Sequence, residues 1–394
     1  MGIFSGLFSR TKKDELALVF DIGSSSVGGA LFEITESRIP RIIFSIREPI
    51  LLEKQIDFDR FLFLTVKSLE IVAEKISKSG QGAPKKIFVT LSSPWYASQT
   101  RIIGLQKDIP FIFTKKFADG LIDKEINLFE EEYLKKYAHP KDTVRSVEIK
   151  NIKTTLNGYE TTKPFNQKAK EFEMTIFVSI SPEQVLGKIE QAINKYFHLK
   201  DIKFFSFVMS SFVVARDIFT HQENFLLIDL GGEVTDIAMI KNNALRESIS
   251  YPSGSNFLIR GVASSLKCTL EEAKSFISLY KDGHAVGSVA KKLEPILSEL
   301  KKSWLQKFQE SLANLSNDIS IPANIFLAVD KEFYDFFSEI IKTEQFNQYT
   351  LTESKFEVTF LGTETLSGIA TFKGSVTRDP FLALEAIYIN RFFN

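Results

Sequence analysis

Apolar runs of strand length occur in two matching pairs along the chain. Each pair has a first strand, a turn of small residues and a second strand, at residues 16–22 and 30–34 and again at 224–230 and 234–240. An aspartate, Asp21 or Asp229, stands next to the end of the first strand in each pair. Because the same order occurs twice, the pattern predicts two structurally related lobes.

Apolar residues at helical spacing mark three longer segments. Residues 58–79, 182–197 and 287–315 each place apolar side chains on one face, with polar residues opposite. Ser181 is the expected N-cap of the second helix, with Pro182 at its first position.

The region between the two pairs has a different pattern. Short strands are expected at 98–105 and 172–180, and an acidic helix at about 116–136. Polar, turn-rich sequence separates them from Asn157 to Lys170. We therefore expect residues 96–180 to form a small α+β subdomain inserted into the first lobe.

Composition narrows the class of protein. A chain of 394 residues with 44% apolar side chains exceeds what one hydrophobic core usually holds, so more than one lobe is expected. Basic and acidic residues balance at 49 each, which argues against nucleic acid as a partner. One cysteine, Cys268, and four scattered histidines fit a reducing cytoplasm and argue against a Cys/His metal site. The longest charge-free apolar run that could be mistaken for a membrane span, residues 204–215, is too short for a transmembrane helix.

The two ends of the chain differ in character. Residues 1–13 predict an amphipathic leader that lies on a membrane, whose apolar face is Ile3, Phe4, Leu7 and Phe8 and whose basic residues are Arg10, Lys12 and Lys13. The alternative is a leader whose apolar residues pack nowhere, since so short a segment binds weakly by itself. Residues 379–394 predict a helix that closes the core of the first lobe.

The two small-residue turns carry the candidate chemistry. Backbone N–H groups in such turns face one concave surface, which an anion can approach because no Cβ atom obstructs it. Two turns suit a nucleotide phosphate chain gripped from both sides, with Mg²⁺ held through water by Asp21 and Asp229. The alternative is that each turn merely closes a hairpin. The candidate cofactor-binding residues are Asp21, Gly23, Ser24, Ser25, Ser26, Asp229, Gly231, Gly232, Glu233 and Thr235.

These motifs resemble those of a known superfamily. The segment 21–26 (DIGSSS) resembles the first phosphate motif of the actin, hexokinase and FtsA superfamily, and 229–236 (DLGGEVTD) resembles the second. The segment that begins at Asn157 (NGYETTKPFN) resembles FtsA more than PilM. The resemblance implies an α/β, actin/hexokinase-type two-lobed fold with an FtsA-type α+β (SHS2-like) insertion in the first lobe.

The resemblance also implies an organisation into segments. The expected ranges are 1–13 for the leader, 14–95 and 181–222 for the first lobe, 96–180 for the SHS2-like insertion, 223–375 for the second lobe with a helical subdomain at about 262–315, and 376–394 for the C-terminal helix of the first lobe.

Three places depart from the family pattern. Glu233 replaces the third glycine of the second turn and brings negative charge toward the phosphates. Residues 328–330 (AVD) replace a glycine turn beneath the adenosine, and Ile259 with Gly261 replace polar residues. The cleft is therefore either occupied by nucleotide or degenerate, and the sequence leaves both open.

As function, the resemblance implies an FtsA-like scaffold at the inner face of the cytoplasmic membrane that organises division machinery. ATP with Mg²⁺ is the implied cofactor, and a cytoskeletal or membrane protein is the implied partner, with self-association into filaments as a further expectation. A PilM-like pilus component that binds a cytoplasmic peptide of a membrane protein is the alternative. A small-molecule kinase of the same fold is a third, but the sequence nominates no general base for it.

Overall fold

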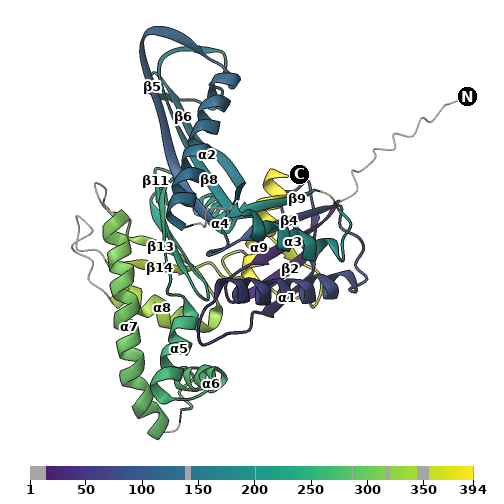
Figure 1. Ribbon diagram of the computed structural model, residues 1–394, viewed down its shortest axis with the longest axis vertical. Coiled ribbons are helices and arrows are strands. Elements are labelled where there is room, and N and C mark those ends of the chain that lie inside the picture. Colours follow the sequence, from purple (N-terminus) through teal and green to yellow (C-terminus); the bar gives the residue numbers. More distant parts are fainter. Residues whose placement is uncertain are drawn as a thin grey trace, which may run out of the picture.

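The computed structural model describes residues 15–137, 143–199, 201–285, 287–315, 320–343 and 355–393. The predicted leader, residues 1–13, lies outside these ranges. The described chain forms two lobes side by side, and a third, smaller unit projects beyond them (Figure 1). In the described part, no helix has the length and apolar character needed to cross a bilayer.

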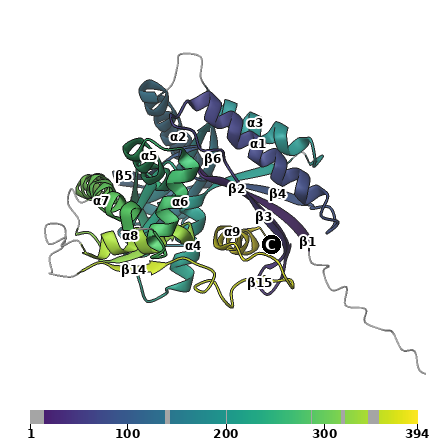
Figure 2. The same ribbon diagram turned by 90° about the horizontal axis from the view of Figure 1, so that it is seen from below.

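The first lobe is built on a six-stranded sheet in the order β15-β3-β2-β1-β4-β9. Its strands are β1 (Glu15–Ile22), β2 (Ser26–Ile34), β3 (Arg41–Pro49), β4 (Lys86–Leu91), β9 (Ile202–Ser206) and β15 (Thr371–Phe372). Helices α1 (Phe58–Ser77) and α3 (Glu183–Asn194) cover one face, and α9 (Pro380–Phe392) covers the other (Figure 2). Strand β15 joins this sheet through β3, although the sequence ranges placed residues 371–372 in the second lobe.

The second lobe is built on a five-stranded sheet in the order β12-β11-β10-β13-β14. Its strands are β10 (Phe225–Leu230), β11 (Thr235–Lys241), β12 (Ala244–Tyr251), β13 (Asn324–Val329) and β14 (Glu357–Phe360). Helices α5 (Ser255–Leu266), α6 (Leu270–Lys281), α7 (Gly287–Leu315) and α8 (Lys331–Thr343) pack with it around a core that includes the fully buried Trp304. Helix α4 (Phe207–Ile218) contacts both α9 and β10 and so joins the lobes.

The projecting unit is a separate four-stranded sheet in the order β5-β8-β6-β7, with one helix on it. Its elements are β5 (Ala97–Phe113), α2 (Lys115–Tyr137), β6 (Val144–Leu156), β7 (Tyr159–Glu160) and β8 (Gln167–Pro182). It has its own core, in which Phe113, Phe172 and Ile176 are almost fully buried. The finer prediction, that this unit is of the FtsA type, stays a prediction.

Two local expectations need correction. Helix α3 begins at Glu183, and the hydroxyl of Ser181 donates to the carbonyl of Trp95 instead of capping the helix. Strand β8 continues to Pro182, so Ser181 belongs to a strand that is fixed by pairing with β6. The first small-residue turn is also shorter than expected, because residues 27–29 pair with β1 and belong to β2.

The two predicted hairpins are equivalent within their sheets. In the first, β1 pairs antiparallel with β2 and parallel with β4; in the second, β10 pairs antiparallel with β11 and parallel with β13. The turns that follow Asp21 and Asp229 lie at the same ends of the strands in both lobes. This arrangement brings the two turns to one place between the lobes.

Candidate functional site: a cleft closed by arginines

Both small-residue turns are closed by the same backbone hydrogen bond. The N–H of Gly23 donates to the carbonyl of Ser26, at 3.1 Å, and that of Gly231 donates to the carbonyl of Val234, at 3.0 Å. Asp21 and Asp229 line the same small cavity beside these turns. The structure therefore brings the candidate residues of the two lobes together.

The turns contact each other directly across the cleft. The N–H of Glu233 donates to Oγ of Ser24, at 3.0 Å. A Cβ atom placed on Gly232 would lie 2.7 Å from Cβ of Ser25, and one on Gly231 would lie 2.8 Å from Oγ of Ser24. The glycines of the second turn thus allow close approach of the first turn, in the place where a phosphate would approach.

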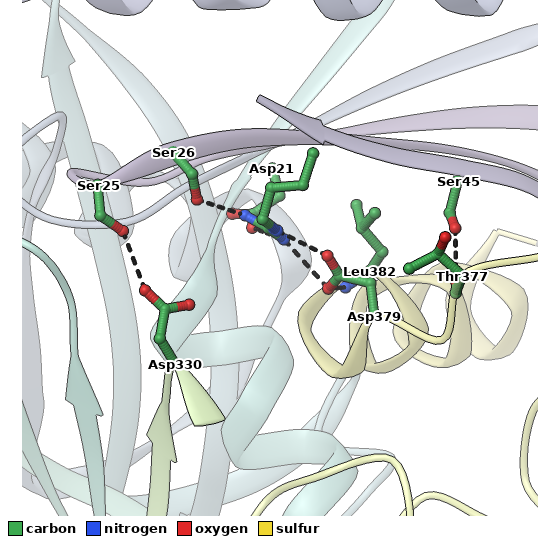
Figure 3. A network of polar contacts seen from close by, with 9 residues as sticks. Asp21, Ser25, Ser26, Ser45, Asp330, Thr377, Asp379 and Leu382 are labelled. Atoms are coloured by element: carbon green, nitrogen blue, oxygen red, sulfur yellow. Dashed lines mark hydrogen bonds and ion pairs between the residues drawn. The ribbon is translucent and has the colours of Figure 1, made fainter. Parts of the chain in front are cut away.

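Arg47, which the sequence analysis missed, lines the cavity of the cleft. Figure 3 shows its partners Asp21, Ser26 and Asp379 close together. The Nη2 atom of Arg47 is 2.7 Å from Oδ2 of Asp21, and its Nε atom is 2.6 Å from Oδ2 of Asp379, the N-cap of α9. Its Nη1 atom donates to Oγ of Ser26, at 3.0 Å. The candidate metal ligand Asp21 therefore already binds a cation, the guanidinium group of the protein itself.

A glycine makes this contact possible. Gly28 on β2 lies between Asp21 on β1 and Arg47 on β3 in the register of the sheet. A Cβ atom on Gly28 would lie 2.7 Å from Nη2 of Arg47. The sequence shows both Gly28 and Arg47, but only the pairing of β2 with β3 shows that they lie opposite each other.

Burial shifts the protonation of the carboxyl groups around Arg47. Burial raises the pKa of Asp21, while the charge of Arg47 opposes that shift. Glu385 of α9 is fully buried beside Asp21, and burial together with the charge of Asp21 raises its pKa well above the ordinary value. Burial by itself lowers the pKa of Arg47, but the charges of Asp379 and Asp21 outweigh it and hold the pKa well above its usual value, so the guanidinium stays charged.

The second lobe contributes more buried carboxyl groups. Burial raises the pKa of Asp229 well above its ordinary value, and the charges of Asp236 and Asp21 add to this shift. Burial raises the pKa of Asp236 to about 6, although Ser93 donates to Oδ1 of Asp236 at 2.9 Å. Asp330 follows β13 and accepts a long hydrogen bond, 3.4 Å, from Oγ of Ser25.

Glu233 is neutralised by a second arginine. Nη1 and Nη2 of Arg260 lie 2.6 and 2.8 Å from the two carboxylate oxygens of Glu233, and Nδ2 of Asn256 donates to Oε1 at 2.8 Å. Nε of Arg260 donates to the backbone carbonyl of Glu53 in the first lobe, at 2.8 Å. This arginine thus connects the second turn to the first lobe at the mouth of the cleft.

The remaining candidate positions are engaged within the protein. Thr235 donates its hydroxyl hydrogen to the carbonyl of Ser253, at 2.8 Å. Ile259 is buried in the second core, and a Cβ atom on Gly261 would lie 2.4 Å from Leu300. Ala328 is a buried residue of β13.

The residues present do not fit a nucleotide with Mg²⁺ in this arrangement. The cavity beside Asp21 and Asp229 has a volume of ≈ 30 Å³, whereas a small-molecule pocket usually needs about 300 Å³ or more. Arg47 occupies the metal side of Asp21, and Glu233 with Arg260 fills the side of the second turn. Among the described residues, no group of three or more His, Cys, Asp or Glu side chains is arranged to hold a metal ion.

Comparison with known proteins identifies the type of fold. No protein-family model matches the sequence, and no curated protein matches it. Among solved structures, the PilM–PilN type IV pilus biogenesis complex matches with a TM-score of 0.55 and 13% identity, over 95% of this chain and 96% of that chain. The chain has a two-lobed, actin-like ATPase fold.

Other solved structures match less well. The ethanolamine utilization protein EutJ from Carboxydothermus hydrogenoformans matches with a TM-score of 0.41 and 11% identity, over 96% of this chain and 89% of that chain. A Bacteroides thetaiotaomicron protein with an actin-like ATPase fold and unknown function matches with a TM-score of 0.35 and 10% identity, over 96% of this chain and 98% of that chain. With TM-scores below 0.5, these two matches add no argument about this chain.

Proposed function

We propose that this protein is a non-catalytic, actin-fold assembly scaffold that acts at the inner face of the cytoplasmic membrane without a nucleotide cycle. The observation that carries the proposal is the cleft, where Arg47 and Arg260 bind the carboxylates of both phosphate-type turns and the turns touch. A kinase needs an open phosphate path and a free general base. The described cleft has no such open path because the turns touch, so its residues support a structural role.

Two cellular roles fit such a scaffold. In the FtsA-like role the protein organises division machinery and contacts sister subunits or a filament; the segment from Asn157 supports this role by its sequence resemblance. In the PilM-like role it binds a cytoplasmic peptide of a membrane protein; the match to the PilM–PilN complex over almost the whole chain supports this role. Under either role, we assign the unit from Ala97 to Pro182 as an SHS2-like module, available for partner contacts.

Calorimetric titration of Mg-ATP into the purified protein tests the absence of a nucleotide cycle. We expect no saturable binding, because a ligand would have to displace two buried ion pairs and separate the turns. Low-micromolar affinity would contradict the proposal. A Glu233→Gly variant separates the causes: a gain in affinity would identify the charge of Glu233 as the obstacle, and no gain would assign the obstacle to the Arg47–Asp21 pair and the contact between the turns.

Depletion of the protein in cells separates the two roles. Loss of an FtsA-like organiser is expected to give filamentous, undivided cells, whereas loss of a PilM-like component is expected to remove surface pili and leave division unchanged. A fluorescent fusion spread evenly through the cytoplasm would contradict a membrane scaffold of either kind.

A further inference from the structure

An arginine-lined groove lies at the end of the first lobe opposite to the cleft. Helix α9 begins at the cleft, where its N-cap Asp379 binds Arg47, and ends at Phe392. A helix of this length spans about 20 Å, so its C-terminal end lies at the far edge of the sheet. The groove there has a volume of ≈ 670 Å³ and is lined by the C-terminal ends of α4 and α9, the turn between β2 and β3, Asn243 and Ile369.

The charged side chains that line the groove are mostly basic. They are Arg38, Arg216 and Arg391, with Asp217 as the one carboxylate of the lining. Asp217 forms ion pairs with Arg216, at 3.2 Å, and with Arg391, at 2.5 Å. The lining therefore carries two positive charges that Asp217 does not balance, and the hydroxyls of Ser37 and Thr220 add further polar groups.

Helix dipoles explain two of these arginines but not the third. Arg216 and Arg391 lie in the last turns of α4 and α9, where a cation is favoured by the partial negative charge of the helix end. Arg38 lies on a turn, is exposed and has no side-chain hydrogen bond or ion pair among the described residues. Its backbone has a φ of 62°, in the left-handed region that a non-glycine residue rarely adopts.

The turn that carries Arg38 is fastened to α9. The buried side chain of Asn390 accepts a hydrogen bond from the N–H of Thr35, at 2.7 Å, and Oγ1 of Thr35 donates to the carbonyl of Ile39, at 2.7 Å. These bonds hold the turn over the end of the helix. Arg38 is thus positioned beside the groove by the fold itself.

The two residues that follow Arg391 are aromatic, and their rings lie beside lysines. Phe392, which follows Arg391, is 48% exposed. Nζ of Lys150 lies 5.2 Å from its ring centroid, and Nζ of Lys203 lies 5.2 Å from that of Phe393. An apolar ring among basic side chains is typical of surfaces that contact the headgroup region of a bilayer.

The chain also enters the first lobe at this edge. Glu15, the first described residue, pairs in register with Ile34 next to the β2–β3 turn, and its carboxylate lies 2.9 Å from Nζ of Lys86. The same Nζ atom donates to the carbonyl of Phe393, at 3.2 Å. The start of β1 and the end of α9 therefore lie together beside the groove.

We propose that this groove binds the phosphate headgroup of an anionic lipid, with Phe392 and the adjoining lysines against the bilayer surface. The inference rests on the membrane location in the proposed function and adds to it a contact made by the folded first lobe. Arg38, Arg216 and Arg391 supply the donors, since guanidinium groups bind phosphate oxygens with two parallel hydrogen bonds. The lobe then faces the membrane with the edge that lies opposite to the cleft.

Sedimentation with vesicles tests this site in the full-length chain. The vesicles are phosphatidylcholine with or without phosphatidylglycerol, and the starting protein carries Phe4→Ser and Phe8→Ser so that the leader contributes little. Adding Arg38→Glu is expected to lower binding to the anionic vesicles about fivefold or more, since each basic residue near such a surface contributes about 1 kcal/mol. Adding Lys163→Glu, the same charge change at an exposed position of the projecting unit, is expected to leave binding within a factor of about two.

Further variants and controls of the vesicle experiment separate the possible explanations. An Arg38→Asn variant, whose residue tolerates a positive φ, should also bind less tightly if charge and not folding is responsible. Equal binding by the Arg38 variants and the Lys163→Glu control overturns the proposal. Calorimetric binding of inorganic phosphate that Arg38→Glu abolishes, while vesicle binding stays unchanged, also overturns it, because the groove then serves a soluble anion. If only the leader substitutions abolish binding, this site fails while the membrane location stands; if the unmodified protein does not bind anionic vesicles, the membrane location fails too.

Discussion

Arg47 contacts Asp21 across Gly28: the three residues form one row over strands β3, β2 and β1, and Nη2 of Arg47 lies 2.7 Å from Oδ2 of Asp21. The same guanidinium binds Asp379 at the N-terminus of α9. A cation of the protein thus neutralises carboxylates from the first strand and from the last helix of the lobe. Because Arg47 is part of the protein, these contacts hold the cleft closed without a bound ligand.

Replacing Arg47 should destabilise the fold strongly. In an Arg47→Met variant, Asp21 and Asp379 lose their cation inside the protein, and removing one partner of a buried ion pair typically costs about 3–5 kcal/mol. Urea denaturation at neutral pH should show a lower midpoint. Arg41→Met is the matched control, because the Arg41–Glu33 pair is largely exposed and should cost less than about 1 kcal/mol. Equal losses in both variants would contradict a special role for Arg47.

Gly28→Ala should disturb the same ion pair without removing any charge. The added methyl group would lie 2.7 Å from Nη2 of Arg47 and 3.2 Å from Leu382, and such overpacking costs about 1–3 kcal/mol. The free energy of unfolding should fall by that amount. Gly104→Ala is the control, because its nearest neighbouring atom lies 3.8 Å away. A neutral Gly28→Ala would show that Arg47 can move aside freely.

The sequence predicted the two turns that line this cleft but not the arginine that binds Asp21. The repeated strand-turn-strand pattern identified both turns, and the two-lobed fold was confirmed. The strand pattern carries this information because alternation and turn residues act locally. Asp21 was assigned to metal, yet the structure shows it bound to Arg47, which lies 26 residues away on a strand two places along the sheet.

Glu233 illustrates the same limit in the second lobe. From the sequence, its charge was expected to repel phosphate, and nothing pointed to Arg260. That arginine lies on α5, which follows the next two strands, β11 and β12, so the pairing depends on how α5 packs against the turn. A close approach such as Gly232 against Ser25 depends likewise on how the two lobes meet, which no local pattern determines.

Stability should depend on pH through the carboxyl groups of the cleft. Asp236 has an ordinary pKa of 3.8 that is raised to about 6 in the folded protein. Between these values the unfolded chain has lost the proton while the folded protein keeps it. The contribution of Asp236 to stability is therefore complete below about pH 4, falls as the pH rises to about 6, and is flat above.

An Asp236→Asn variant isolates this contribution. The difference in free energy of unfolding, variant minus wild type, should shift in favour of the variant by on the order of 3 kcal/mol between pH 4 and pH 7, given about 1.4 kcal/mol per pKa unit. Denaturation midpoints measured across this range provide the test. A difference that stays constant with pH, or that shifts in favour of the wild type, would show that burial does not penalise the ionised form of Asp236.

A buried carboxyl group ties the projecting unit to the first lobe. Glu148 of β6 accepts a hydrogen bond from the hydroxyl of Tyr388 on α9, at 2.7 Å, and its other oxygen accepts from the backbone N–H and the hydroxyl of Ser206, at 3.3 and 3.1 Å. All three residues are buried, and burial raises the pKa of Glu148. The contacts connect β6 of the projecting unit to α9, the helix that runs from the cleft to the arginine-lined groove.

Removing Glu148 should loosen this connection. In a Glu148→Leu variant the N–H of Ser206 and the hydroxyl of Tyr388 lose their partner inside the core, and each unsatisfied group costs about 1–3 kcal/mol. Amide hydrogen exchange should accelerate in β6 and β9 relative to β10 of the second lobe. Tyr388→Phe removes only one donor and should cost less. Because both substitutions break the same bond, the double variant should lose less stability than the sum of the single variants. Additive losses, or unchanged exchange in β6, would show that the projecting unit is held by its apolar contacts instead of by this carboxyl group.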